Sequence, residues 1–346
     1  MAIDLGAFMA TMVAQSPPVP IARVVTLVRE RFGLEVHATR LTGERDENIK
    51  LTTYDGAEYV LKIASVMEDA AVAELQTAAL LHLQRTDAAL PCPRVLRTLD
   101  GDTAIRFEDA PGRQRTARVV SYLPGRLLAE SGESSRQRAA CGHMAGRLAR
   151  ALGRFGHPAA HRAVIWDLRQ VRHLGLLLEQ LPGFEHRSAA LALLARIVPP
   201  IEARLPRMRQ QVVHNDLNRR NILVDATDDA RVTGVIDFGD LICTALIADV
   251  GIAGAELIAR GCADPDCARA CVLDVVRAYH ECVPLLPPEL SILGTLVAAR
   301  LLMNVVVHEW YVRHNPLSRH CAPLDRDFVR AQLELADGLP MEDLRL

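Results

Sequence analysis

The spacing of apolar side chains changes from helical to strand-like and back within the first quarter of the chain. Residues 21–32 carry apolar side chains at helical intervals, and the pattern stops at Gly33. Residues 34–64 then contain three short runs of β-forming residues, and Asp55-Gly56 between two of these runs is a strong hairpin signal. Helical spacing returns over residues 67–86. We therefore predict three antiparallel strands followed by a helix.

The rest of the chain divides near Leu123-Pro124-Gly125, because a Pro-Gly pair favours a boundary. Strand-like runs precede this boundary at 94–99, 103–109 and 115–123. Helical patterns follow it at 133–155, 165–181, 187–210, 246–260, 265–282 and 289–313. Residues 221–240 are an exception, since they read as strand, turn and strand with the turn at 227–229.

This order of elements predicts an α+β fold with two lobes. We assign residues 1–20 to a leader, residues 21–123 to a small antiparallel β-sheet lobe, and residues 124–346 to a larger, mainly helical lobe. Half of the residues are hydrophobic, which is typical of a globular protein that buries a large core.

The charge balance excludes a partner bound through bulk charge, because 40 basic residues nearly cancel 42 acidic ones. The first residues lack the basic start of a signal peptide, and Asp4 interrupts their apolar run. The longest apolar segment, 292–307, carries Arg300 and Asn304, so we read it as a buried helix. We expect a cytoplasmic protein that binds a small molecule, and neither nucleic acid nor membrane. The sequence leaves the oligomeric state open.

Eight cysteines are expected to stay reduced in a large chain without an export signal. Cys262, Cys267, Cys271 and Cys282 lie near His280 and invite a metal site, but no C-x-x-C knuckle of the zinc-ribbon kind occurs. We prefer the interpretation that cysteines here serve as small apolar side chains on one helix face. The role of the four cysteines stays open.

The segment "VVHNDLNRRNILVD" gathers polar side chains beside the predicted hairpin. Asn221 immediately precedes the first strand and Asp237 ends the second, so an antiparallel pairing makes them neighbours. Asp216 lies on the incoming loop. A carboxamide and two carboxylates suit Mg²⁺, and a carboxylate set slightly apart can accept a proton from a substrate hydroxyl. We expect His214 to support this loop.

The motif His214-x-Asp216-x4-Asn221, followed by Asp237-Phe238-Gly239, resembles the catalytic and metal loops of the kinase superfamily. A residue other than Arg between His214 and Asp216 is similar to the aminoglycoside phosphotransferase and choline kinase-like family. The resemblance implies a protein-kinase-like fold whose N-terminal lobe binds the nucleotide. It also implies that Asp216 acts as base and that Asn221 and Asp237 hold Mg²⁺.

The same resemblance assigns nucleotide contacts in the first lobe. Lys62 lies in "YVLKIA" and Glu74 in the next helix, and burying either charge alone would be costly, so we predict that they pair. Lys62 would then hold the phosphates. The loop "LTGERDENIKL" lacks the G-x-G-x-x-G pattern, and its backbone amides are expected to bind phosphate. The remaining expected nucleotide contacts are Arg45, Asn48, Ser121, Tyr122 and Leu123.

The segments "GERDEN", "YVLKI", "AVIWDLRQV" and "HNDLNRRNIL" are together similar to the hydroxylysine kinase branch. This implies transfer of the γ-phosphoryl group of ATP or GTP to a hydroxylated amino acid or amino alcohol. Two alternatives remain, an aminoglycoside O-phosphotransferase and a nucleotide-binding regulatory module without catalysis (a pseudokinase). The complete set of catalytic residues argues against the second.

Candidate acceptor contacts lie in the helical lobe. Substrates of this branch carry ammonium groups, which favour carboxylates such as Asp240 and Glu256, while Asp249 and Glu309 are further candidates. Arg300 and Asn304 lie four residues apart and form a polar stripe on an apolar helix. Arg300 either binds a substrate carboxylate or pairs, buried, with Asp249 or Glu256.

Overall fold

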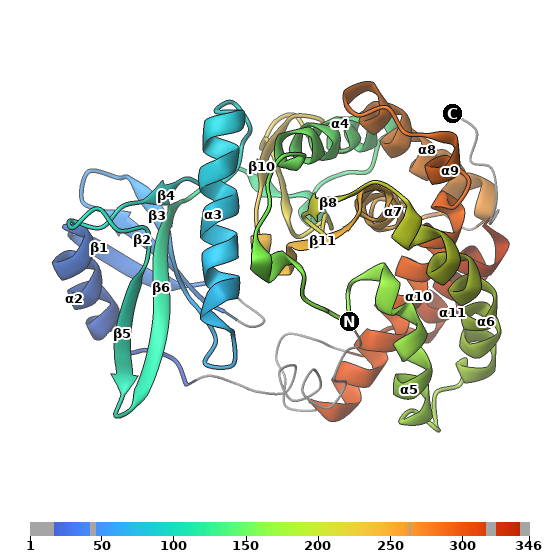
Figure 1. Cartoon of the computed structure of the whole chain (residues 1–346), viewed down its shortest axis with the longest axis horizontal. Coiled ribbons are helices and arrows are strands. Elements are labelled where there is room, and N and C mark those ends of the chain that lie inside the picture. Colours follow the sequence, from blue (N-terminus) through green and yellow to red (C-terminus); the bar gives the residue numbers. More distant parts are fainter. Residues whose placement is uncertain (1–16, 42–45, 263, 316–322, 340–346) are drawn as a thin grey trace. The chain divides into compact units, whose positions relative to one another are not determined.

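The chain divides into two compact units at Pro124 and Gly125 (Figure 1). The computed structural model describes residues 17–41, 46–262, 264–315 and 323–339. Of the predicted leader, only residues 17–20 fall within these ranges, and helix α2 begins directly after them.

The first unit holds a six-stranded antiparallel sheet in the order β1-β2-β3-β6-β4, with β5 paired to β6 (Figure 1). Helix α3 follows β3, so the observed order of elements after α2 is the predicted one. Helix α2 ends at Gly33, whose φ of 69° suits glycine. The elements are α2 (Ile21–Phe32), β1 (Val36–Arg40), β2 (Glu47–Thr53), β3 (Glu58–Ile63), α3 (Ala70–Thr86), β4 (Val95–Leu96), β5 (Ile105–Ala110) and β6 (Arg113–Ser121).

The two faces of this sheet have different chemistry. Leu61 and Val119 lie in a fully buried cluster with Val28 of α2. Strand alternation turns Lys62 and its cross-strand partner Arg118 to the opposite face. Arg118 donates a hydrogen bond to Gln76 of α3. Lys62 is therefore on the face of the sheet that α3 approaches.

The second unit is mainly helical (Figure 1). It contains the predicted hairpin, β9 with β10, to which β7 pairs. A second small sheet joins β8 to β11. The strands are β7 (Arg126–Leu127), β8 (Gln210–Val213), β9 (Ile222–Val224), β10 (Val232–Val235) and β11 (Ile242–Ala245). The α-helices are α4 (Ser135–Leu152), α5 (Leu174–Glu179), α6 (Arg187–Arg204), α7 (Leu246–Glu256), α8 (Pro265–Cys282), α9 (Pro287–Leu290), α10 (Leu293–His314) and α11 (Arg326–Gly338). The 3-10 turns are η1 (Leu128–Glu130), η2 (Pro158–Ala160), η3 (Leu168–His173), η4 (Leu205–Arg207) and η5 (Phe238–Asp240).

Helix α10 forms the centre of this unit. The segment Pro287–His314 is the one stretch of the described chain that is long and apolar enough to cross a bilayer, and 83% of its most apolar window is buried inside the protein. That burial is typical of the core helix of a soluble protein.

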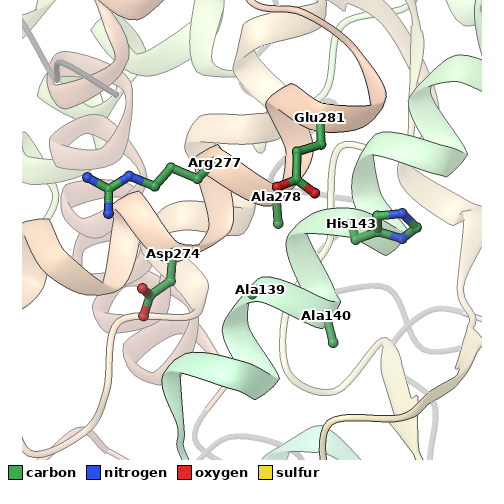
Figure 2. A pocket seen from close by; sticks show the side chains of 7 residues that line it. All are labelled: Ala139, Ala140, His143, Asp274, Arg277, Ala278 and Glu281. Atoms are coloured by element: carbon green, nitrogen blue, oxygen red, sulfur yellow. The ribbon is translucent and has the colours of Figure 1, made fainter.

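Helices α4 and α8 pack closely because Gly142 faces the backbone of Val275, where a Cβ atom would overlap it. A hollow of about 380 Å³ lies beside this contact (Figure 2). Its lining residues are Ala139, Ala140, His143, Asp274, Arg277, Ala278 and Glu281. None of the predicted site residues lines this hollow.

Two helical predictions for the second unit need correction, and one helix was not predicted. The predicted helix 165–181 is a 3-10 turn, η3, followed by the short helix α5, because Asp167 caps the turn at Arg169. The predicted helix 289–313 begins as α9 and restarts as α10. Helix α11 was missed, although Asp325 caps it and apolar side chains recur at helical spacing along it.

Candidate functional site

His214 connects the loop before β9 to the end of β10. Its Nδ1 accepts a hydrogen bond from the backbone N–H of Asp216 at 3.3 Å, so Nε2 carries the proton and donates to the carbonyl of Ile236 at 3.1 Å. The ring is fully buried and packs edge-to-face on Phe238. A neutral imidazole thus holds the backbone on both sides of the site.

Two residues of this region have backbone conformations that L-residues rarely adopt. Asn215 has a φ of 66° and Asp237 a φ of 61°, and they are the non-glycine residues with positive φ in the described chain. Such conformations cost free energy, and functional sites are enriched in them. Asn is among the residues that tolerate them best, which explains its place between His214 and Asp216.

The hairpin brings the chain segments of Asn221 and Asp237 together. The backbone N–H of Ile236 donates to the carbonyl of Asn221 at 2.9 Å, which places Asp237 one residue beyond that pair. The Asn221 amide nitrogen donates to the Asp216 carboxylate at 2.7 Å and to its carbonyl at 2.9 Å. Asp237 is exposed, and its carboxylate accepts from Gly239 N–H at 3.3 Å.

A buried arginine joins the catalytic loop to the candidate acceptor residues. Arg300 of α10 contacts the carboxylates of Asp216 at 2.9 Å and Glu256 at 2.8 Å. Its guanidinium carbon lies 4.9 Å from the centre of the Trp166 ring, and Asn304 donates to Glu256 at 2.9 Å. Of the two alternatives left by the sequence, the structure favours the buried pairing of Arg300 with Glu256.

The surroundings of Asp216 favour proton transfer near neutral pH. Burial raises the pKa of Asp216 to about 7, Arg300 opposes the rise, and the charges of Asp240 and Glu256 add to it. About a fifth of the Asp216 side chain, 19%, stays exposed, so a substrate hydroxyl can reach it. A carboxylate whose pKa lies near the working pH is suited to act as a general base.

Asp249 of α7 supports the catalytic loop from inside and is not available to an acceptor. It is 2% exposed and accepts a hydrogen bond from the backbone N–H of Asn215 at 2.7 Å. Burial raises the pKa of Asp249 to about 6, while hydrogen bonds from the backbone of Asn215 and His214 and the charge of Arg300 lower it. The buried carboxyl therefore holds its proton more strongly in the folded chain than in the unfolded chain.

This pKa predicts a pH-dependent loss of stability that Asp249→Asn removes. A carboxyl whose folded pKa is raised contributes stability below its unfolded value, 3.8, and this contribution is lost as the pH rises through about 6. We expect wild type to lose about 2 to 3 kcal/mol relative to Asp249→Asn between about pH 4 and about pH 7. Urea unfolding at each pH measures the difference. Asp266→Asn, an exposed control, should track wild type, and parallel curves for wild type and Asp249→Asn would contradict the assignment.

The expected ion pair between Lys62 and Glu74 is absent from the described part of the first unit. Glu74 is exposed, whereas Gln76 is 1% exposed and contacts the sheet through Arg118. Two residues correspond to about 200° around a helix, so a helix that turns Gln76 to the sheet turns Glu74 away. The pairing prediction was therefore wrong.

Other predicted nucleotide contacts are partly brought together. Asn48 of β2 lies directly opposite Lys62 of β3. The backbone N–H groups of Ser121 and Tyr122 already donate to the carbonyls of Arg94 and Glu58, so their amides are less available to a purine. Arg45 lies outside the described residues. Leu123 lies shortly after the end of β6, and its contact with the nucleotide stays a prediction.

Comparisons with known proteins identify the family and the fold of the chain. A protein-family model with the description "Phosphotransferase enzyme family" matches residues 37–287 of the sequence. The hydroxylysine kinase of Mus musculus is 30% identical over 259 residues, which are 68% of this chain and 68% of that protein. The structure of amicoumacin kinase hAmiN with AMP-PNP, Ca²⁺ and Ami has a TM-score of 0.71 at 15% identity and covers 93% of this chain and 94% of its own. A microcompartment-associated aminopropanol kinase has a TM-score of 0.62 at 17% identity and covers 92% and 95%. The predicted α+β, protein-kinase-like fold is confirmed.

Proposed function

The chain belongs to the phosphotransferase enzyme family, and we propose that it phosphorylates a hydroxylated amino acid or amino alcohol of the hydroxylysine type. As a member of that family it is a small-molecule kinase, with a hydroxyl group as acceptor and a nucleotide as co-substrate. The donor we propose is ATP or GTP, used with Mg²⁺. The observation that carries the proposal is a partly exposed Asp216 carboxylate held by Arg300 and Asn221.

Asp216 is proposed to take the proton of the acceptor hydroxyl as its oxygen attacks the γ-phosphorus. Arg300 and Asn221 each hold one oxygen of its carboxylate, so the side chain has one orientation before substrate arrives. Preorganisation of this kind lowers the activation barrier without covalent participation of the protein.

The donor chemistry of Asn221 and Asp237 fits Mg²⁺. The Asn221 amide nitrogen donates to Asp216, so the Oδ1 atom of Asn221 points away from Asp216. This Oδ1 atom is the oxygen that Asn221 offers to a metal ion. Asp237 adds a carboxylate, and one or two such groups plus phosphate oxygens are what Mg²⁺ takes in kinases. When bound, the ion offsets negative charge on the transferred phosphoryl group.

Charge in the acceptor region favours a small zwitterion over a polycation. Glu256 is engaged by Arg300, which it shares with Asp216, and by Asn304, so its carboxylate is already occupied. An aminoglycoside carries several ammonium groups and needs several unpaired carboxylates. The hydroxylysine relative adds a second, independent reason for preferring an amino acid acceptor.

An acceptor screen tests the proposal. Purified protein, Mg²⁺ and either ATP or GTP are combined with 5-hydroxylysine, 1-amino-2-propanol or kanamycin, and the release of ADP or GDP is measured. Lysine, which lacks the hydroxyl, is the matched control. We expect kcat/KM for hydroxylysine to exceed that for kanamycin by about 100-fold, and lysine to give no turnover. A preference for kanamycin would contradict the acceptor class.

Lys62→Ala is expected to raise the nucleotide KM about tenfold, because a charge-assisted contact to phosphate is lost. Lys50 and Lys62 are the only lysines of the sequence, which makes Lys50→Ala the natural control. Lys50 contacts Glu58 at 2.6 Å and Tyr122, so its side chain is already engaged. An unchanged nucleotide KM in Lys62→Ala would remove this residue from the nucleotide site.

A further inference from the structure

Three cysteine sulfurs meet where α8 begins. Cys262 and Cys267 form a disulfide, so the expectation that all cysteines are reduced was wrong for this pair. The Sγ atom of Cys271 lies 3.6 Å from that of Cys262, and the three sulfurs lie within 4.8 Å of one another. Helix geometry explains the meeting, because positions 267 and 271 share one face of α8 and the preceding loop returns Cys262 to it.

The three sulfurs differ in exposure and in their suitability as leaving groups. Cys262 is 6% exposed and Cys271 is 3% exposed, whereas Cys267 is half-buried. Cys267 lies in the first turn of α8, where the helix dipole stabilises a thiolate. A thiolate at Cys267 is therefore the better leaving group when its bond to Cys262 is attacked.

The loop that carries Cys262 also holds the catalytic loop. Arg219, two residues before Asn221, donates to the carbonyls of Glu256 at 3.0 Å and Ile258 at 3.2 Å. The Glu133 carboxylate contacts Arg219 at 2.9 Å and accepts from the backbone N–H of Arg260 at 2.8 Å. Residues 256–260 thus connect Cys262 to the segment that positions Asp216 and Asn221. Reasoning from the sequence missed Arg219, for which the Arg pair in "HNDLNRRN" is the only local signal.

We propose that Cys262, Cys267 and Cys271 form a thiol–disulfide exchange site that is coupled to the catalytic loop. Cys271 loses its proton, and the thiolate attacks Sγ of Cys262. A Cys262–Cys271 bond forms as the Cys262–Cys267 bond breaks, and Cys267 leaves as a thiolate that takes up a proton. The exchange has no net oxidation or reduction. It moves the attachment of Cys262 from the first turn of α8 to the second, and the loop that holds Arg219 moves with it.

Alkylation of the oxidised wild-type chain tests the exchange. The protein is incubated with N-ethylmaleimide without reductant and digested with trypsin, also without reductant. Cleavage after Arg260, Arg269 and Arg277 places Cys262 and Cys267 in peptide 261–269 and Cys271 in peptide 270–277. We expect the label on Cys267 and the two peptides joined through Cys262 and Cys271, since Cys267 is the most exposed of the three once it is released. The other cysteines fall in other tryptic peptides.

Three outcomes of this experiment would overturn the exchange. They are a label confined to Cys271, an unlabelled disulfide that stays within peptide 261–269, and a protein that holds a thiophilic metal on three free thiols. Cys271→Ala is the control, because it lacks the attacking thiol and should leave Cys267 unlabelled. The wild-type labelling pattern decides the question even if that variant folds poorly.

Two variants test the coupling to catalysis. Cys271→Ala keeps the Cys262–Cys267 bond, and Cys267→Ser treated with oxidised glutathione forms the Cys262–Cys271 bond. We expect Cys271→Ala to keep the kcat of the wild type and trapped Cys267→Ser to differ from it by about fivefold. Dithiothreitol should reduce the Cys262–Cys271 bond of Cys267→Ser and change the kcat of this variant a second time. Equal kcat values for the two disulfide forms would overturn the coupling.

Discussion

Asp216→Asn should lower kcat by about three orders of magnitude and leave the nucleotide affinity within about twofold of wild type. The substituted side chain keeps an oxygen that accepts from Arg300, whereas its NH2 group replaces the oxygen that accepts from Asn221. It has no charge and cannot take the proton of the acceptor hydroxyl. Steady-state turnover with the best acceptor of the screen, together with a nucleotide titration, measures both quantities.

Asp225→Asn is the matched control for this substitution. Asp225 lies at the far end of the β9–β10 hairpin, where its carboxylate accepts from the N–H of Thr227 at 2.8 Å, and Asn can keep that bond. The control should turn over like wild type. If Asp216→Asn keeps a kcat within about tenfold of wild type, then Asp216 does not act as the base.

The hairpin that organises the site could be predicted because its signals are local. Short runs of apolar residues, a polar turn and the antiparallel rule bring the ends of β9 and β10 together, and the observed strands lie on either side of the predicted turn. The left-handed backbone at Asn215 is likewise consistent with its residue type. Short-range physics therefore places Asp216, Asn221 and Asp237 in one region of the chain.

Contacts that depend on tertiary packing could not be predicted in the same way. Which face α3 turns to the sheet depends on its whole set of buried residues, so the spacing of Lys62 and Glu74 did not fix their relation. Arg300 is 84 residues from Asp216, and no pattern along the chain indicates their contact. The polar stripe on α10 indicated that Arg300 makes a polar contact inside the protein. The choice between Asp249 and Glu256 as its partner depended on how α7 packs against α10.

Arg300→Met should lower the free energy of unfolding by about 3 to 5 kcal/mol, because it leaves two largely buried carboxylates without their buried cation. Arg300 is 3% exposed and contacts both Asp216 and Glu256, so both acids lose a partner at once. We also expect kcat to fall about 100-fold, since the Asp216 carboxylate loses one of the two groups that orient it. Urea unfolding measures the free energy of unfolding, on condition that the variant and wild type have the same m-value. Steady-state turnover measures the kcat.

The double variant Arg300→Met/Glu256→Gln separates these two effects. Glutamine removes the unpaired charge at position 256 and keeps an oxygen for Asn304, so much of the lost stability should return. The kcat should stay low, because Asp216 still lacks its cation. Recovery of both quantities would mean that Arg300 serves only to neutralise Glu256. A loss of less than about 1 kcal/mol in Arg300→Met itself would mean that the pairing with Asp216 does not persist in solution.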